Sequence, residues 1–194
     1  TTLYLKVTDG GFNYKDYSSQ SQRAALYIGQ DDAPAKVSKL FTAAPTGISW
    51  ADAGFVQPFL NRLNTTLTFG ATEYVGRRYS ERGTNTGAGG RTSTNVILST
   101  TRGELVIAPA SGKIDLAEDL GGDYGYTLVI DHGAGVRTIF YGLSDVDIKA
   151  GQQVKQGQTL ATCGKTTVVE MRIGTVPIDP IAVWRGQCNG LKYY

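Results

Sequence analysis

The sequence predicts a mainly β protein that folds as a compact antiparallel barrel or sandwich. Between residues 103 and 160, glycine turns separate short apolar or alternating runs such as Glu104–Ile107, Thr127–Ile130 and Val136–Tyr141. The chain contains 25 glycines but only 6 prolines, which is typical of a protein rich in tight turns. Strands this short at this spacing favour an antiparallel arrangement over a parallel α/β sheet.

Length and charge exclude several classes of protein. The 194 residues are enough for one good-sized domain, or for one domain with a substantial extension, and 41% of them are hydrophobic. The 19 basic and 17 acidic residues give a net charge of +2, which is too balanced to predict a nucleic-acid groove or an anionic membrane surface. The sequence has no run of 18 apolar residues, so we expect no membrane-spanning helix.

Residues 1–66 are expected to form an α+β extension that packs on or flanks a main domain at residues 67–194. Thr1–Thr8 alternates apolar and polar side chains like a half-buried strand, and Ala24–Ile28 is a second short strand candidate. Residues 12–23 have no clear period and are expected to be loop. Aspartates followed by Pro34 are typical of a helix start, which predicts a helix over about Pro34–Thr42. The apolar stretch Trp50–Leu63 is expected to dock on the main domain.

Residues 82–94 form a Gly/Thr-rich connection that is expected to be loop. It has neither the Gly-Lys-Ser/Thr ending of a P-loop nor a Gly-x-Gly-x-x-Gly motif that opens a helix, so we exclude a phosphate cradle. From residue 95 onward the β pattern is dense. The strand candidates are Val96–Leu98, Glu104–Ala108, Gly112–Asp115, Tyr126–Asp131, Val136–Tyr141, Gln158–Cys163 and Val168–Ile173.

Six segments resemble, in order, the lysostaphin-type (LytM-like) zinc endopeptidases, which cut peptide cross-bridges in bacterial peptidoglycan. The resemblance covers roughly residues 67–185 and implies that family's antiparallel β fold. The segments that carry it are Thr68–Gly70, Val106–Ile114, Tyr124–Gly133, Thr138–Ser144, Val154–Gln158 and Val176–Pro180.

The resemblance implies a zinc site, but the ligand positions have changed. Members of the family hold zinc with an H-x-x-x-D motif and the second histidine of H-x-H, and further histidines activate water and stabilise the intermediate. The first motif falls on Arg91 and Asn95, and the H-x-H histidines fall on Thr166 and Val168. A catalytic histidine of the family becomes Gly142.

A count of histidines supports the same conclusion. The chain has one histidine, His132, which matches a turn position of the family that is not a metal ligand. A His/Asp/His zinc site cannot be assembled from one histidine. The sequence therefore predicts a pseudo-enzyme with no metal, no cofactor and no catalytic residues.

The residues at and near the former ligand positions are able to form ion pairs in place of a metal site. Strand periodicity places residues 166, 168, 170 and 172 on the face where the resemblance would place the metal. Val168 cannot ligate a metal, whereas Glu170, Arg172 and the nearby Arg91 are able to pair where zinc would supply positive charge. The alternative is a solvated Arg91 beside an ordinary Glu170 at a strand edge.

The two cysteines, Cys163 and Cys188, are compatible with one disulfide or with two unlinked thiols. A disulfide would favour the periplasm or the exterior of the cell.

We expect a catalytically inactive module of the peptidoglycan-endopeptidase fold that acts by binding, in cell-envelope assembly or in the regulation of a cell-wall hydrolase. Its partner would be a protein of the envelope or peptidoglycan, and its location periplasmic or extracellular. The residues expected to line the former groove are Arg91, Asn95, Tyr141, Glu170 and Arg172.

Three other interpretations compete with this one. The first is a structural component of an extracellular or phage-like assembly, with Tyr14, Tyr17 and Tyr27 as contact residues. The second is a Ser/His/Asp arrangement around His132, which is disfavoured because adjacent strand residues such as Asp131 and His132 point to opposite faces. The third is a biotinyl or lipoyl carrier, which we reject because no lysine lies in the required hairpin context.

Overall fold

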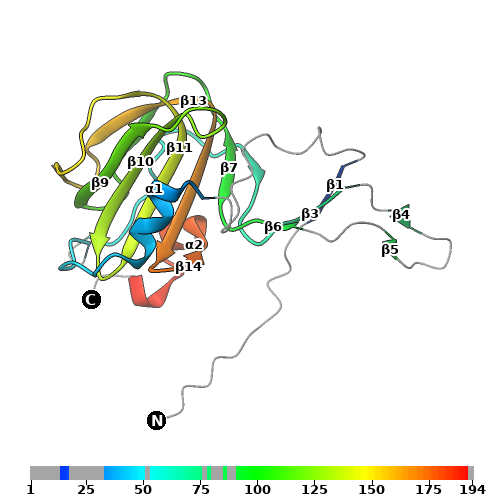
Figure 1. The fold of residues 1–194 in the computed structure, drawn as a ribbon, viewed down its shortest axis with the longest axis horizontal. Helices are drawn as coiled ribbons and strands as arrows, with labels where there is room; N and C mark the ends of the chain where they lie inside the picture. The colour runs from blue at the N-terminus through cyan, green and yellow to red at the C-terminus, as the bar shows by residue number, and fades with distance from the viewer. Residues whose placement is uncertain are drawn as a thin grey trace, which may run out of the picture.

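A nine-stranded sheet forms the body of the described part of the molecule (Figure 1). The computed structural model describes residues 14–17, 33–50, 53–75, 78–79, 85–86 and 91–191. Seven strands follow the order β12-β9-β10-β11-β13-β7-β2, and β8 and β14 each pair with β13. All pairings in this sheet are antiparallel, which confirms the predicted fold class. The strands are β2 (Thr65–Leu67), β7 (Val96–Ser99), β8 (Leu105–Ile107), β9 (Gly112–Asp119), β10 (Tyr126–Gly133), β11 (Val136–Val146), β12 (Gln153–Val154), β13 (Thr159–Ile173) and β14 (Val176–Ile178).

The 15-residue strand β13 joins the parts of the sheet. β11 pairs with one of its edges, and β8, β7 and β14 pair with the other. Its side chains alternate between two cores, because Val169 packs in the cluster that contains Phe140, whereas Val168 packs in the cluster that contains Tyr141. Both faces of the sheet are therefore covered.

Residues 33–50, here called the strap, cross one face of the sheet. The strap contains α1 (Ala35–Ser38) and the 3-10 helix η3 (Lys39–Thr42), which confirms the predicted helical segment. Val37 and Phe41, one helical turn apart, are buried against Ile97, Tyr141 and other residues of the sheet. Figure 1 shows α1, in blue, lying in front of the sheet near β13.

The second half of the strap is fastened to the turn between β10 and β11. The amide of Ala134 donates to the carbonyl of Thr46 (2.9 Å), and the amide of Ser49 donates to the carbonyl of His132 (2.8 Å). Gly133 has φ +91°, and a Cβ placed on it would lie 1.9 Å from the carbonyl oxygen of Gly47. Only glycine permits this approach of the two backbones.

From Trp50, the last residue of the strap, the chain turns to the other side of the sheet. Trp50 and Phe55 are buried in a third cluster, and Phe59 is buried in the main core, where it forms an isolated antiparallel bridge with Val106. These contacts agree with the docking expected for residues 50–63. β2 spans the expected boundary between residues 66 and 67, and the division into two domains stays a prediction.

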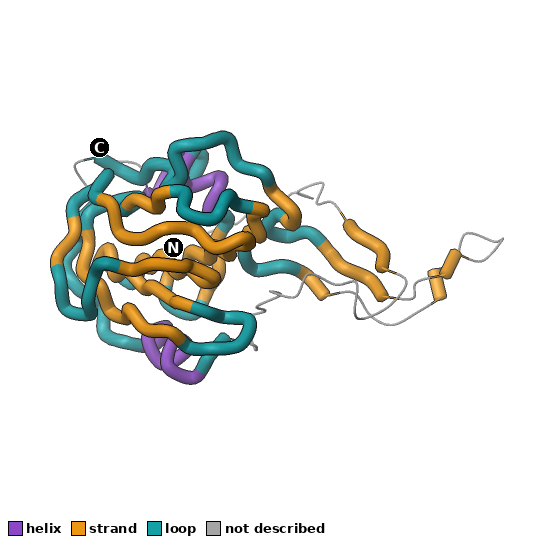
Figure 2. Tube along the Cα trace, turned by 90° about the horizontal axis from the view of Figure 1, so that it is seen from above, coloured by secondary structure: helices purple, strands orange, loops and turns teal. Residues whose placement is uncertain are grey.

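Two smaller sheets lie beside the body (Figure 2). β1 (Tyr14–Tyr17) runs parallel to β3 (Thr72–Val75), which also pairs with β6 (Arg91–Thr92), and β4 (Arg78–Tyr79) pairs with β5 (Asn85–Thr86). The expectation of loop for residues 12–23 and 82–94 was therefore wrong in part. β1 and β6 pair with a strand distant in sequence, so a local pattern carries little signal of them. The strand candidates at residues 1–8 and 24–28 lie outside the described residues.

The chain ends its described part with α2 (Pro180–Trp184) and the 3-10 helix η4 (Asn189–Leu191). Asp179 caps α2, because its Oδ1 accepts a hydrogen bond from the amide of Ile181 (2.9 Å). Within the described residues, we find no helix with the length and apolar character needed to span a bilayer.

The contact between Gly133 and Gly47 predicts a specific sensitivity to a methyl group. We expect Gly133→Ala to destabilise the protein by at least about 2 kcal/mol, because the new Cβ adds a backbone clash to the cost of a positive φ. Gly157→Ala is the matched control, because Gly157 has φ +79° but no atom within 4 Å of its Cβ position. That control is expected to lose only about 1 kcal/mol. Urea unfolding measures both, and equal losses would contradict the close contact.

Candidate functional site

The residues singled out on β13 lie on the face that the strap covers, here called the strap face. Val168 is directly opposite Tyr141 on β11 and Ile97 on β7, and Glu170 is opposite Ile139. Residues opposite one another in a ladder share a face. The shared face predicted for residues 168, 170 and 172 is therefore present in the structure.

Glu170 and Arg172 form a buried ion pair at the centre of the strap face. Arg172 Nη1 donates to Glu170 Oε1, Arg172 Nη2 donates to the carbonyl of Thr175, and neither side chain is more than 1% exposed. The ring of Phe41 from the strap lies over the guanidinium, 3.9 Å from Cζ to the ring centroid. The hydroxyl of Tyr141 is buried beside the carboxyl group of Glu170, and Arg172 Nε is buried without a hydrogen-bond partner among the described residues.

Burial shifts the acid–base properties of this cluster. It raises the pKa of Glu170 to about 7, although the neighbouring Arg172 opposes the shift. Burial, together with the charge of Glu170, also raises the pKa of Tyr141 well above its ordinary value. Tyr141 is therefore a neutral phenol at physiological pH, and Glu170 is a carboxyl group that changes its charge close to neutral pH.

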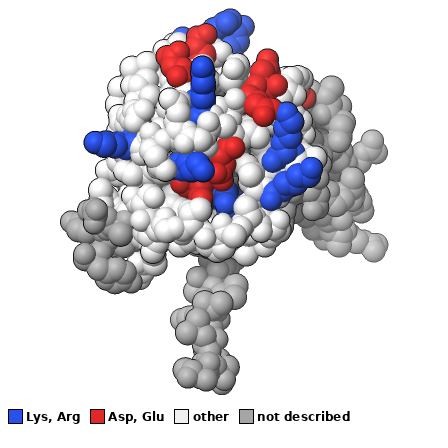
Figure 3. Space-filling model, turned by 60° about the vertical axis from the view of Figure 1, so that its left-hand side comes forward, with Lys and Arg blue, Asp and Glu red and all other residues white. Residues whose placement is uncertain are grey.

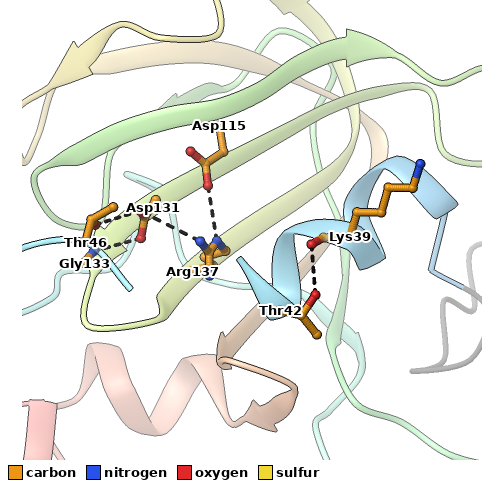
Figure 4. Close-up of polar contacts among 7 residues, drawn as sticks. All are labelled: Lys39, Thr42, Thr46, Asp115, Asp131, Gly133 and Arg137. Atoms are coloured by element: carbon orange, nitrogen blue, oxygen red, sulfur yellow. Dashed lines mark hydrogen bonds and ion pairs between the residues drawn. The ribbon is translucent and has the colours of Figure 1, made fainter. Parts of the chain in front are cut away.

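A second charged cluster lies on the strap face, toward the turn between β10 and β11 (Figure 4). Arg137 is opposite Arg172 in the ladder, donates to Asp115 Oδ2 through Nε (3.2 Å) and has Nη2 3.9 Å from Asp131 Oδ2. Asp131 also accepts from the hydroxyl of Thr46 in the strap (2.8 Å). The strap thus contacts one charged cluster through Phe41 and the other through Thr46.

Sequence analysis missed Arg137 as a site residue. Its signal was an arginine inside the apolar run Val136–Tyr141, at a position that alternation assigns to the same face as Ile139 and Tyr141.

His132 is buried, and hydrogen bonds within the fold hold its ring. Its Nδ1 is 2.8 Å from the carbonyl oxygen of Ser111, and its Nε2 is 2.9 Å from the hydroxyl of Thr138. A carbonyl only accepts, so Nδ1 carries the proton and Nε2 accepts from Thr138. Burial lowers the pKa of His132 to about 4, which keeps the ring neutral at physiological pH. Both ring nitrogens are already engaged.

The other predicted positions lie in different elements of the fold. Asn95 is buried just before β7, where its carbonyl accepts from the hydroxyl of Ser93 (2.8 Å). Gly142 has φ +75° and lies at a register shift between β11 and β13, as expected of a β-bulge. Arg91 lies in β6 opposite Glu73, and its side chain lies outside the described structure.

The strap face is not an open groove. Asn95, Tyr141, Glu170 and Arg172 are each fully buried. Phe41 and Val37 pack over this face. The expected concave surface at these positions is therefore filled by the chain itself.

The residues present do not fit a zinc ion. Zinc requires three or four converging His, Cys or carboxylate ligands, and no such group of three occurs in the described part of the chain. The carboxylates of the strap face are already paired, Glu170 with Arg172 and Asp131 with Arg137. The fixed positive charge of two buried guanidiniums also disfavours a divalent cation.

No disulfide joins the two cysteines in the structure, so the disulfide considered from the sequence is not confirmed. Cys163 is buried in the main core, whereas Cys188 packs against the third cluster beside α2. The two thiols belong to different cores, and a bridge needs their Cα atoms within about 7 Å.

Comparison with known proteins identifies the fold. Residues 91–180 match the model of peptidase family M23. Residues 91–180, a little under half of the chain, therefore form a domain of the peptidase M23 (LytM) type, as the motifs suggested.

Individual relatives support the same family. A curated Haemophilus influenzae protein, described as an uncharacterized metalloprotease, is 32% identical over 95 residues, which are 45% of this chain and 20% of that protein. A peptidase M23 structure from Pseudomonas aeruginosa superimposes with a TM-score of 0.58 at 22% identity, over 78% of this chain and 58% of that one. A chain of the SpoIIQ–SpoIIIAH pore-forming complex gives 0.53 at 19% identity, over 67% and 90%. This chain thus spans about a fifth of the length of the curated relative.

The buried ion pair predicts strong coupling between its partners. We expect Glu170→Met alone to cost about 3–5 kcal/mol, because it leaves the guanidinium of Arg172 as an unpaired buried charge. Arg172→Met is expected to cost less, because Glu170 then takes up a proton, and the double variant is expected to lose much less than the sum of the two. The exposed pair Lys36–Glu118 is the matched control, and its two methionine variants are expected to show coupling close to zero. A double-mutant cycle by urea unfolding measures both, and additive losses at Glu170 and Arg172 would refute the coupling.

The raised pKa of Glu170 predicts a defined pH dependence of stability. The folded protein holds this proton up to about pH 7, whereas the unfolded chain releases it near the ordinary value of 4.5, so the contribution of Glu170 to stability falls as the pH rises between these values. The free energy of unfolding of the wild type minus that of Glu170→Gln is expected to fall by about 3 kcal/mol across this window. Because both proteins contain His132, the contribution of its titration cancels when the two free energies of unfolding are subtracted. A pH-independent difference would show that Glu170 is ionised throughout.

Proposed function

We propose that this protein is a catalytically silent module of the peptidase M23 fold that acts by binding, in envelope assembly or in the regulation of a cell-wall hydrolase. The observation that carries the proposal is the buried Glu170–Arg172 pair on the strap face, beside Val168. An arginine fixes positive charge there but cannot polarise a water molecule into a nucleophile as a metal does.

The strap supports the same proposal independently. A hydrolase must bring its substrate and a water molecule to the reacting groups, whereas Phe41 closes the strap face over Arg172. Because the strap contacts one charged cluster through Phe41 and the other through Thr46, opening it would expose both clusters. We therefore place partner binding on the outer surface rather than in the former groove.

Two exposed apolar pairs are candidates for that surface. Leu60 is 69% exposed and Leu105 43% exposed, and the antiparallel bridge between Phe59 and Val106 places them side by side. Ile173 and Val176 are paired across the β13–β14 hairpin and are also exposed. Figure 3 shows that charges of both signs are mixed on the face in view, which disfavours a polyanionic partner.

A structural role in a larger assembly is the second candidate. It is favoured by the similarity to a chain of the pore-forming SpoIIQ–SpoIIIAH complex, which is matched over 90% of its length. Size exclusion with light scattering separates the two candidates, because self-assembly favours the structural role and a monodisperse monomer favours a regulatory module. Both candidates place the protein in the periplasm or outside the cell.

We expect the protein neither to bind zinc stoichiometrically nor to release soluble fragments from purified peptidoglycan. Metal analysis after dialysis and a turbidity assay, with an active M23 enzyme as positive control, measure this. Inactivity results either from the absence of catalytic groups or from the strap that covers them. The double variant Val37→Ser with Phe41→Ser, which loosens the strap, separates these two causes. If that variant alone cleaves peptidoglycan, the protein is a latent enzyme and the proposal is wrong; cleavage or stoichiometric zinc in the wild type would also overturn it.

A further inference from the structure

A cavity of about 510 Å³ lies away from the strap face, between the segment after the strap and α2. Its volume is within the range of sites that hold small molecules. Its walls are apolar and polar in nearly equal parts, it is partly open to solvent, and it borders the third cluster, which contains Trp50, Phe55 and Val183. The residues on which the inference depends are Gly54, Phe55, Val183, Trp184, Arg185 and Leu191.

The walls of this cavity are held in place by the body of the protein. Phe55 packs edge-on against His132, with ring centroids 5.1 Å apart, and the next amide, that of Val56, donates to the carbonyl of Pro109 (2.8 Å). The carbonyl of Gly54 accepts from the side chain of Gln156 (3.0 Å). Trp184 packs edge-on against Phe59 of the main core. A cavity supported in this way needs little ordering when a ligand binds.

The chemistry of the lining defines the ligand class. Arg185 is the one charged side chain among the described residues that line the cavity, and it is exposed. The ring of Trp184 and the edges of Phe55, Val183 and Leu191, which are otherwise buried, offer the apolar surface of the pocket. An apolar body would lie against these walls, and a negative charge at its end would reach the guanidinium at the rim.

We propose that this cavity binds a small organic carboxylate with an aromatic or branched apolar body. The apolar part lies between Phe55 and Trp184, and the carboxylate accepts hydrogen bonds from Arg185. The site is separate from the strap face, so it does not depend on whether the protein is catalytically silent. The carboxylate belongs either to a free small molecule or to the last residue of a peptide, and both present the same chemistry.

The test uses N-acetylphenylalanine, its neutral amide and phenylacetate as probes with the full chain. Titration followed by ¹H–¹⁵N NMR is expected to shift the resonances of Gly54, Gly186 and the Trp184 indole, and the acid is expected to bind about fivefold more tightly than the amide, as for a single solvent-exposed ion pair. Arg185→Gln is expected to abolish this preference, whereas Lys165→Gln, an exposed cation elsewhere, is expected to keep it. Tighter binding of N-acetylphenylalanine than of phenylacetate indicates a peptide end; the reverse indicates a free small molecule.

Two further variants test the location. Ala53 lines the cavity and is exposed, so Ala53→Phe is expected to fill the space without disturbing the core, and to abolish the shifts. A chain ending at Leu191 is expected to bind the acid at least as well as the full chain. Absence of shifts with both chains at millimolar probe, equal affinity for acid and amide, or unchanged binding in Ala53→Phe would each overturn the proposal.

Discussion

The guanidinium of Arg172 carries a full positive charge in a position that water does not reach. Bringing such a group out of water costs several kcal/mol, which must be offset by contacts of good geometry. Three contacts surround it: the carboxylate of Glu170, the carbonyl of Thr175 and the ring of Phe41. These contacts come from β13, from the turn that follows it and from the strap, so one side chain holds three parts of the chain together.

This constraint explains why the strap and the sheet form one unit. Without Phe41 and Val37, the ion pair would be open to solvent on one side, and the apolar residues around it would lose their cover. The second cluster acts in the same way at the other end, because Asp131 binds both Arg137 and Thr46. The charged face of the sheet is therefore part of the protein interior.

The strands and the shared face of Val168, Glu170 and Arg172 could be predicted because glycine turns and alternation are local properties of the sequence. The strap could be predicted as helical for the same reason. Its position could not, because Thr46 and Asp131 are 85 positions apart and no local pattern encodes their contact. Arg137 was overlooked because alternation shows which residues share a face but not whether that face is covered. The separation of Cys163 from Cys188 likewise depends on how distant elements pack.

The attachment of the strap by backbone groups at residues 46–49 also constrains the order of folding. Its partners are the carbonyl of His132 and the amide of Ala134, which are brought into position only when β10 and β11 have formed their hairpin. Closing so long a loop costs more chain entropy than forming that hairpin. We therefore expect the sheet to assemble while its charged face is still hydrated, and expulsion of water from Arg172 and Glu170 to be the last event of folding.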